Sequence, residues 1–199
     1  MKNRPRVILI CCEGATEKAY FEIISKHYRI TSARINIVGE GGSQHKALID
    51  RTVEERTKLA DELDLETDDI LSWAVCDDDG MTIPYPELQN YARAHDVELA
   101  FSSPQFEAFL LQHFEQSGEI GQDALLKKLS EYKNSCGNPV AINKTTKADL
   151  GWLRQAIFEK PKLIETAIIN ANQRTHHQKG KPFFTVQMLV EYLKSLEVR

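Results

Sequence analysis

The stretch ILSWAVCDDDG, residues 70–80, runs from an apolar segment directly into three aspartates and a glycine. Its first seven residues are typical of a buried strand, and the glycine suits a turn. Three adjacent carboxylates repel one another unless a cation or a proton is shared among them. We therefore expect a positive charge to bind where this strand ends.

The first half of the chain repeats the same alternation of strand and helix. Further strands are predicted at RVILICC, ARINIVG and VELAFSS, residues 6–12, 33–39 and 97–103. Helices are predicted at residues 13–29, 46–63, 86–95 and 104–114, with Pro104 in the first turn of the last one. Strands that alternate with helices need crossover connections. The sequence therefore predicts an α/β fold with a mostly parallel sheet flanked by helices.

The second half of the chain shows a helical pattern only. After Gly118, helices are predicted at residues 122–133, 147–160, 161–174 and 185–196. We therefore expect an α/β core over residues 1–116 and a helical C-terminal extension over residues 117–199. The extension is expected to pack on the core and form one compact domain with it.

Composition is that of ordinary globular material, with 199 residues, 42% hydrophobic and 27% charged. No stretch approaches the roughly 18 consecutive apolar residues that a membrane span needs. The four cysteines lack C-x-x-C spacing, which favours reduced thiols. These features predict a cytoplasmic protein without a membrane partner. The net charge of −4 argues against binding nucleic acid by bulk attraction, although a local basic patch can still bind it.

The carboxylates of two distant segments are expected to meet at one edge of the sheet. Ligand sites of open α/β sheets form beyond the carboxyl ends of the strands. If the strands at 6–12 and 70–76 are neighbours, Glu13 converges with Asp77 and Asp79. Side chains alternate along an extended chain, so these two aspartates point to one side and Asp78 points away.

The start of the first helix adds a further carboxylate to this group. Gly14 lets the backbone turn sharply after Glu13, and Thr16 is a reasonable cap for the helix. Glu17 then falls in the first helical turn, close to Glu13. Hard oxygen ligands without histidine or cysteine partners suit Mg²⁺ or Mn²⁺, which are also bound by substrate phosphates. The sequence thus predicts a Mg²⁺ (or Mn²⁺) cofactor.

Positive charge concentrates in the segment NQRTHHQKGK, residues 172–181. It carries Arg174, His176, His177, Lys179 and Lys181. We weigh a nucleic-acid contact segment and a plain solvated connector equally here. A smaller basic patch is NKTTK, residues 143–147.

Several segments together resemble known proteins. ICCEGATE after the first strand and AVCDDDG after a later one resemble the Toprim arrangement of bacterial primases, topoisomerases and OLD-type nucleases. Four segments, EGATEKAYFE, VCDDDG, SSPQFEAFLLQHF and KPFFTVQMLVEYL, further resemble the RloB family, a Toprim-like group. The similarity runs from Val7 to Leu193.

The resemblance implies roles for individual residues. Glu13 matches the Toprim glutamate, Asp77 and Asp79 match its D-x-D pair, and Glu107 matches the acidic residue of an N-P-x-F-E block. These four are the expected catalytic residues, with Glu13, Glu17, Asp77 and Asp79 as metal ligands and a second ion shared by Glu17 and Glu107. Ser103 replaces the asparagine of that block, and KPFFTV replaces a more polar N-P-S-T-x-V segment. Substrate contacts therefore need not be shared with the family.

The function implied is that of a Mg²⁺-dependent, Toprim-like nuclease acting on DNA or RNA in anti-phage or restriction-linked defence. One alternative is a non-catalytic interaction or sensing module that works with a partner protein. Another is a haloacid-dehalogenase-like phosphatase with Asp77 as nucleophile and Asp79 as acid/base, which leaves Glu13 without a role. Because the chain has no P-loop, ATP-driven activity requires a separate ATPase or other defence subunit. The oligomeric state is left open.

Overall fold

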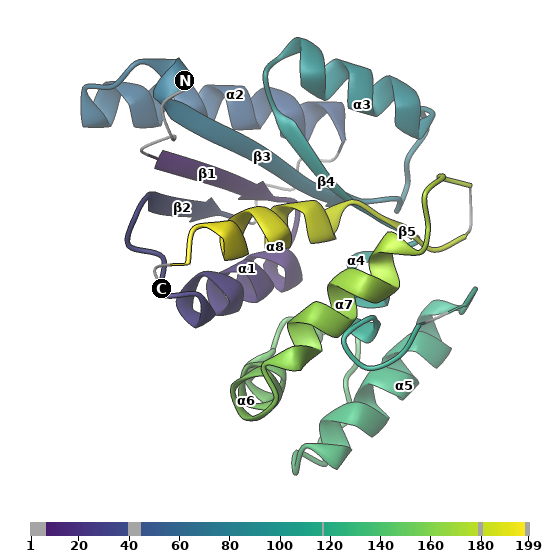
Figure 1. The fold of residues 1–199 in the computed structure, drawn as a ribbon. Helices are drawn as coiled ribbons and strands as arrows, with labels where there is room; N and C mark the ends of the chain where they lie inside the picture. The colour runs from purple at the N-terminus through teal and green to yellow at the C-terminus, as the bar shows by residue number, and fades with distance from the viewer. Residues whose placement is uncertain (1–6, 40–44, 117, 179–180, 198–199) are drawn as a thin grey trace.

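A five-stranded sheet lies between helices in the computed structural model, which describes residues 7–39, 45–116, 118–178 and 181–197 (Figure 1). The strands are β1 (Val7–Cys12), β2 (Arg34–Val38), β3 (Ile70–Asp77), β4 (Glu98–Ser103) and β5 (Phe183–Phe184). Their order is β2-β1-β3-β4-β5, with β1 to β4 parallel and β5 antiparallel to β4. The predicted α/β fold with a mostly parallel sheet is confirmed.

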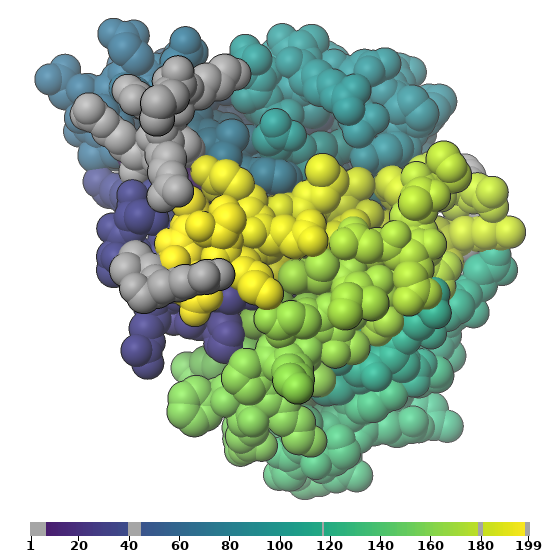
Figure 2. Space-filling view, viewed as in Figure 1, coloured from purple at the N-terminus to yellow at the C-terminus, as the bar shows by residue number. Residues whose placement is uncertain are grey.

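Helices cover both faces of this sheet. They are α1 (Ala15–His27), α2 (Lys46–Leu63), the short 3-10 helix η1 (Thr67–Asp69), α3 (Tyr85–Ala94), α4 (Phe106–Leu111), α5 (Gln122–Ser135), α6 (Gly151–Glu159), α7 (Lys162–Asn172) and α8 (Val186–Ser195). In Figure 1, α2 and α3 lie on one face, α1 and α8 lie on the other, and α5 to α7 gather beyond α4. Figure 2 shows α8, in yellow, covering the middle of the viewed face. No helix within the described ranges combines the length and apolar character that membrane crossing requires.

The apolar run of β1 follows from this double cover. Every residue of β1 is buried. Its alternate side chains Ile8 and Ile10 join the core under α1 and α8, while Val7 and Leu9 join the core under α2 and α3. A strand buried on both faces reads as a continuous hydrophobic run, because neither set of alternating positions can be polar.

Some predicted details are wrong. Pro104 lies before α4, whose cap is Gln105, because β4 extends to Ser103 and pairs there with Phe183. The helical pattern after Gly118 is interrupted by β5, which extends the sheet. The helix predicted from residue 147 begins only at Gly151, because Asp149 donates its backbone N–H to the Thr146 carbonyl oxygen and accepts from the Gly151 N–H at Oδ1, which holds residues 146–150 in a turn. The division of the chain at residue 116 stays a prediction.

Candidate metal centre

The carboxyl ends of β1 and β3 lie side by side, as expected for neighbouring strands. Cys12 pairs with Val75 in the parallel register. The next residue, Glu13, donates its backbone N–H to the Val75 carbonyl oxygen at 3.0 Å. This bond holds Glu13 beside the end of β3, because Val75 lies only two residues before Asp77.

A pocket of about 400 Å³ opens at this edge, and we call it the carboxylate pocket. Its lining residues are Glu13, Gly14, Ala15, Thr16, Glu17, Asp77, Asp79, Lys144, Thr145, Lys147 and Ala148. All four residues predicted as metal ligands therefore share one pocket, although they come from two segments far apart in the sequence. Their role as ligands stays a prediction.

The first turn of α1 brings Glu17 into this pocket. The helix is capped by Gly14 in an extended conformation, and Thr16 is buried inside the first turn, so the predicted capping role of Thr16 is wrong. A Cβ atom on Gly14 would lie 2.9 Å from Glu17 Oε2, which is closer than such contacts occur. The absence of a side chain at Gly14 therefore leaves room for the Glu17 carboxylate over the helix start.

Burial changes the protonation of two of the carboxylates. The pKa of Glu17 is raised to about 8, first by burial and then by the charges of Asp77, Glu107 and Glu13. The pKa of Asp77 is raised to about 6, again mainly by burial, although the Asp79 backbone N–H donates to Asp77 Oδ1 at 3.0 Å and opposes the rise. Glu17 therefore carries a proton at neutral pH, in a position where a divalent cation would favour the ionised form.

Glu107 lies behind the pocket and reaches it through a lysine. It sits in the first turn of α4, is only 1% exposed and does not line the pocket. Lys147 Nζ lies 2.9 Å from Glu107 Oε1. Burial alone would lower the pKa of Lys147, but the charges of Glu107, Glu17 and Asp77 outweigh it and raise that pKa. Lys147 is thus held as a cation against the carboxylates.

The sequence did not predict that the basic loop at residues 143–147 belongs to this site. Lys144, Thr145 and Lys147 line the carboxylate pocket, whereas the sequence marked NKTTK only as a minor positive patch. The one available signal was the density of lysine and threonine in this segment, which does not say which edge of the sheet it will meet.

Asp78 points away from its two neighbours, as the alternation of side chains predicts. It does not line the carboxylate pocket. Its Oδ2 atom accepts a hydrogen bond from Ser103 Oγ at 2.9 Å and lies 3.6 Å from His177 Nε2. Asp78 therefore connects β3 to β4 and to the basic segment.

The residues predicted to contact nucleic acid fall into different environments. His176 and Lys181 are exposed, and Arg174 is half-buried with Nη1 donating to the Pro182 carbonyl oxygen at 3.5 Å. His177 packs against the rings of Tyr85, Phe101 and Phe183. Lys179 lies outside the described residues. Contact with nucleic acid stays a prediction for all five.

The acidic side chains in this pocket are carboxylates, and carboxylate oxygens are the kind of ligand that a hard divalent ion prefers. Within the described ranges, no three His, Cys, Asp or Glu side chains are grouped closely enough to hold a metal ion unaided. Mg²⁺ is commonly bound by one or two carboxylates, with water and substrate phosphates completing its shell. A site of this type does not require three protein ligands in advance.

Comparisons with known proteins give one finding at the level of family. No curated protein and no solved structure matches the chain. Among models of protein families, the one described as RloB-like protein matches residues 8–193.

Proposed function

The chain belongs to the RloB-like family, and from this premise we propose that it is a Mg²⁺-dependent, Toprim-like nuclease. The observation that carries the proposal is the convergence of Glu13, Glu17, Asp77 and Asp79 in one pocket at the carboxyl edge of a parallel sheet. Neighbouring carboxylates, one of them buried, repel one another and lose stability unless a cation or a proton is shared among them, so this cluster supports a bound cation. A phosphate-bearing substrate fits such a cation best.

The ligands we propose are Glu13, Asp77 and Asp79, which would have to draw closer together as the metal binds, because the described side chains are not yet grouped as three ligands. Glu17 would join once its proton is lost. Mg²⁺ or Mn²⁺ bound there supplies a Lewis acid for the phosphate and lowers the pKa of a bound water. The predicted sharing of a second ion by Glu17 and Glu107 has a competitor, because Lys147 already places a positive charge against Glu107.

The lysines opposite the carboxylates would bind the substrate phosphate. Lys147 is anchored by Glu107, so its ammonium group is directed at the pocket at little further cost in side-chain entropy. Lys144 is exposed on the same wall and can follow the backbone of a bound strand. Thr145 supplies a hydroxyl between them. The pocket thus presents an acidic wall for the ion and a basic wall for the phosphate.

The phosphatase alternative explains less of this pocket. It needs Asp77 and Asp79 but gives no role to Glu13 and Glu17, which line the same space. A non-catalytic interaction module remains the competing proposal, and the two differ in whether the carboxylates are needed for cleavage or only for binding. From the family resemblance we also propose a role in anti-phage or restriction-linked defence, in the cytoplasm and with a separate ATPase or other defence subunit.

The decisive experiment measures cleavage of labelled single- and double-stranded DNA and RNA by the purified protein with Mg²⁺, Mn²⁺ or EDTA. We expect products only with metal. Glu13→Gln and Asp77→Asn should lower the rate by more than the roughly 10–100-fold that losing an outer partner of a metal ligand costs. Glu22→Gln, on α1 but outside the pocket, is the matched control. Cleavage that survives EDTA or both pocket substitutions would refute the proposal.

A further inference from the structure

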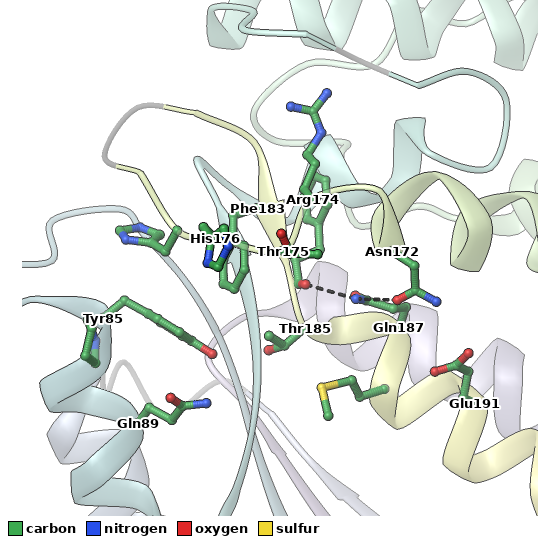
Figure 3. A pocket seen from close by; sticks show the side chains of 14 residues that line it. Tyr85, Gln89, Asn172, Arg174, Thr175, His176, Phe183, Thr185, Gln187 and Glu191 are labelled. Carbon is green, nitrogen blue, oxygen red and sulfur yellow. Dashed lines mark hydrogen bonds between the residues drawn. The ribbon is translucent and has the colours of Figure 1, made fainter.

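A second pocket is linked to the carboxylate pocket through one residue, Asp78. Asp77 and Asp79 line the carboxylate pocket, while Asp78, between them, contacts His177 on the other side. His177 lines a larger hollow of about 700 Å³, shown in Figure 3. Its other lining residues are Tyr85, Pro86, Gln89, Asn172, Arg174, Thr175, His176, Phe183, Phe184, Thr185, Gln187, Met188 and Glu191. This volume lies within the range of small-molecule sites.

Three side-chain amides from three different helices converge on this hollow, which we call the amide pocket. Gln89 comes from α3, Asn172 from α7 and Gln187 from α8 (Figure 3). Gln187 Nε2 donates to the Phe184 carbonyl oxygen and to Asn172 Oδ1, each at 3.0 Å. Because Asn172 Oδ1 accepts this bond, the Asn172 amide presents its N–H₂ group outward. Among the described residues Gln89 makes no side-chain hydrogen bond that would occupy its amide.

The scaffold around these amides is fixed before any ligand binds. Thr185 follows β5 and donates its backbone N–H to the Phe101 carbonyl oxygen at 2.8 Å. Its hydroxyl accepts from the Phe101 N–H at 2.8 Å and donates to the Leu99 carbonyl oxygen at 3.0 Å. His177, packed on Tyr85 and Phe183, holds the segment before β5 against the same wall. A preformed site binds without first ordering its own side chains.

The chemistry of the lining suits a nucleobase better than a phosphate. A base is a flat ring with an edge that carries donors and acceptors side by side, and amides match such edges. The exposed ring of His176 and the exposed side chains of Pro86 and Met188 offer surfaces for the faces of the ring. A phosphate would need clustered cations. The lining supplies the guanidinium of Arg174, whose Nη1 already donates to the Pro182 carbonyl oxygen, and Glu191 adds a negative charge to this wall.

We propose that the amide pocket binds one unpaired nucleobase of the strand whose phosphate enters the carboxylate pocket. The second half of this statement rests on the proposed nuclease function, and the binding of a base does not. A base inside a duplex is stacked on both faces and paired along its edge, so only an unpaired or extruded base can enter. The substrate class assigned is single-stranded or locally unpaired nucleic acid.

The test is equilibrium binding of short single-stranded DNA and RNA probes in EDTA, which prevents metal-dependent cleavage. Each probe is compared with one of the same length that lacks a single base but keeps its phosphates. We expect the intact probe to bind about tenfold more tightly, which is the scale of one stacked base. The double variant Gln89→Ala/Asn172→Ala should lose this preference while binding the abasic probe unchanged.

Matched controls are available one residue away from each amide. Asn90→Ala and Gln173→Ala remove exposed amides outside the pocket and should keep the preference. Gln89→Ala alone keeps the test valid if loss of the Asn172–Gln187 bond disturbs folding. A double variant that keeps the preference, or that weakens binding of both probes equally, would overturn the proposal.

The same assay separates this inference from the nuclease proposal. Glu13→Gln should abolish cleavage and leave the preference for the intact probe unchanged. Base-dependent binding without metal-dependent cleavage by any form of the protein would refute only the nuclease proposal. Cleavage by the native protein without any base preference in EDTA would refute only the amide pocket.

Discussion

The Glu17 carboxyl group shows how strongly the carboxylate pocket resists negative charge in the absence of metal. Its pKa in the folded protein, about 8, lies above the ordinary value of 4.5, because it is buried and near other carboxylates. For a carboxyl group shifted in this direction, the stability contribution is full below pH 4.5. It is lost as the pH rises from 4.5 through the folded value, because the unfolded chain releases this proton while the folded state still keeps it.

Glu17→Gln should remove this pH-dependent loss. Between about pH 5 and pH 9, the wild-type protein should lose on the order of 4 kcal/mol relative to the variant, which has no charge to bury at this position. Urea unfolding in EDTA at several pH values measures this difference. Glu22→Gln controls for the removal of a carboxylate from the same helix. A Glu17→Gln variant that follows the wild-type curve at every pH would contradict the expectation.

Lys147 and Glu107 form the pair on which the other wall of the pocket depends. Removing one partner of a buried ion pair leaves the other charge uncompensated, at a cost of about 3–5 kcal/mol. Lys147 is 34% exposed, so we expect Lys147→Met to cost less, about 2 kcal/mol. Adding Glu107→Gln should restore most of that loss, since no buried charge then remains. Urea unfolding of Lys147→Met, Glu107→Gln and the double variant completes this double-mutant cycle.

Lys144→Met provides the control for this cycle. Lys144 lines the same pocket but, among the described residues, forms no ion pair. Its substitution should change stability little and show no coupling to Glu107→Gln. Equal coupling of both lysines to Glu107 would mean that the field of the whole pocket, and not the close contact, stabilises the pair.

The start of α1 depends on a helix cap that has no side chain. Gly14→Ala would place a Cβ atom 2.9 Å from Glu17 Oε2, and the flexible end of Glu17 can move to relieve the clash. We therefore expect little loss of stability, within about 1 kcal/mol, but weaker Mg²⁺ binding because Glu17 leaves its place. Isothermal titration with Mg²⁺ and urea unfolding measure the two effects separately.

Gly121 offers a matched comparison for that substitution. It caps α5, and a Cβ atom there would meet nothing within 4 Å. Gly121→Ala should leave Mg²⁺ binding unchanged. If both alanine variants bind Mg²⁺ as the wild-type protein does, the position of Glu17 has no bearing on the metal centre.

Elements with many regularly spaced residues could be predicted, and short elements could not. The helix α2 was predicted with its observed bounds, because eighteen residues display the helical period several times. β5 has two residues, Phe183 and Phe184, and two residues show no period at all. Its place in the sheet depends on bonds between Thr185 and the distant residues of β4, which no local pattern encodes.

The carboxylate pocket likewise has one side that could be predicted from local sequence and one that could not. Glu13 and Asp77 could be predicted to meet because each follows an apolar strand, and parallel strands end at one edge. Lys147 could not be placed there, because it lies in the connection between α5 and α6, whose path depends on the packing of the C-terminal helices. Local sequence therefore predicts the acidic wall, whereas the position of the basic wall depends on the tertiary fold.

The acid stability of the entire fold should depend on His113, which follows α4 and packs against Tyr20 of α1 and Phe109 of α4. It is fully buried, with Nε2 3.2 Å from the Tyr20 hydroxyl and Nδ1 3.0 Å from the Leu110 carbonyl oxygen. Both contacts suit a neutral ring that donates from Nδ1 and accepts at Nε2. Burial lowers the pKa of His113 from 6.5 to about 4, and backbone hydrogen bonds only partly oppose this.

Lowering the pH should therefore cost stability through this one ring. The unfolded chain binds a proton at His113 below pH 6.5 and the folded protein does so only below about pH 4, so about 3 kcal/mol is lost between these values. The stability contributions of Glu17 and Asp77 change with pH in the opposite direction, so the wild-type stability curve alone cannot isolate the contribution of His113.

Urea unfolding in EDTA measures this contribution. We expect His113→Gln to be less stable than the wild-type protein at pH 7 but to lose most of this disadvantage by pH 4. His176→Gln, at an exposed ring, should keep a constant difference from the wild-type protein. A His113→Gln difference that is equally constant would mean that the core accepts the imidazolium without unfolding.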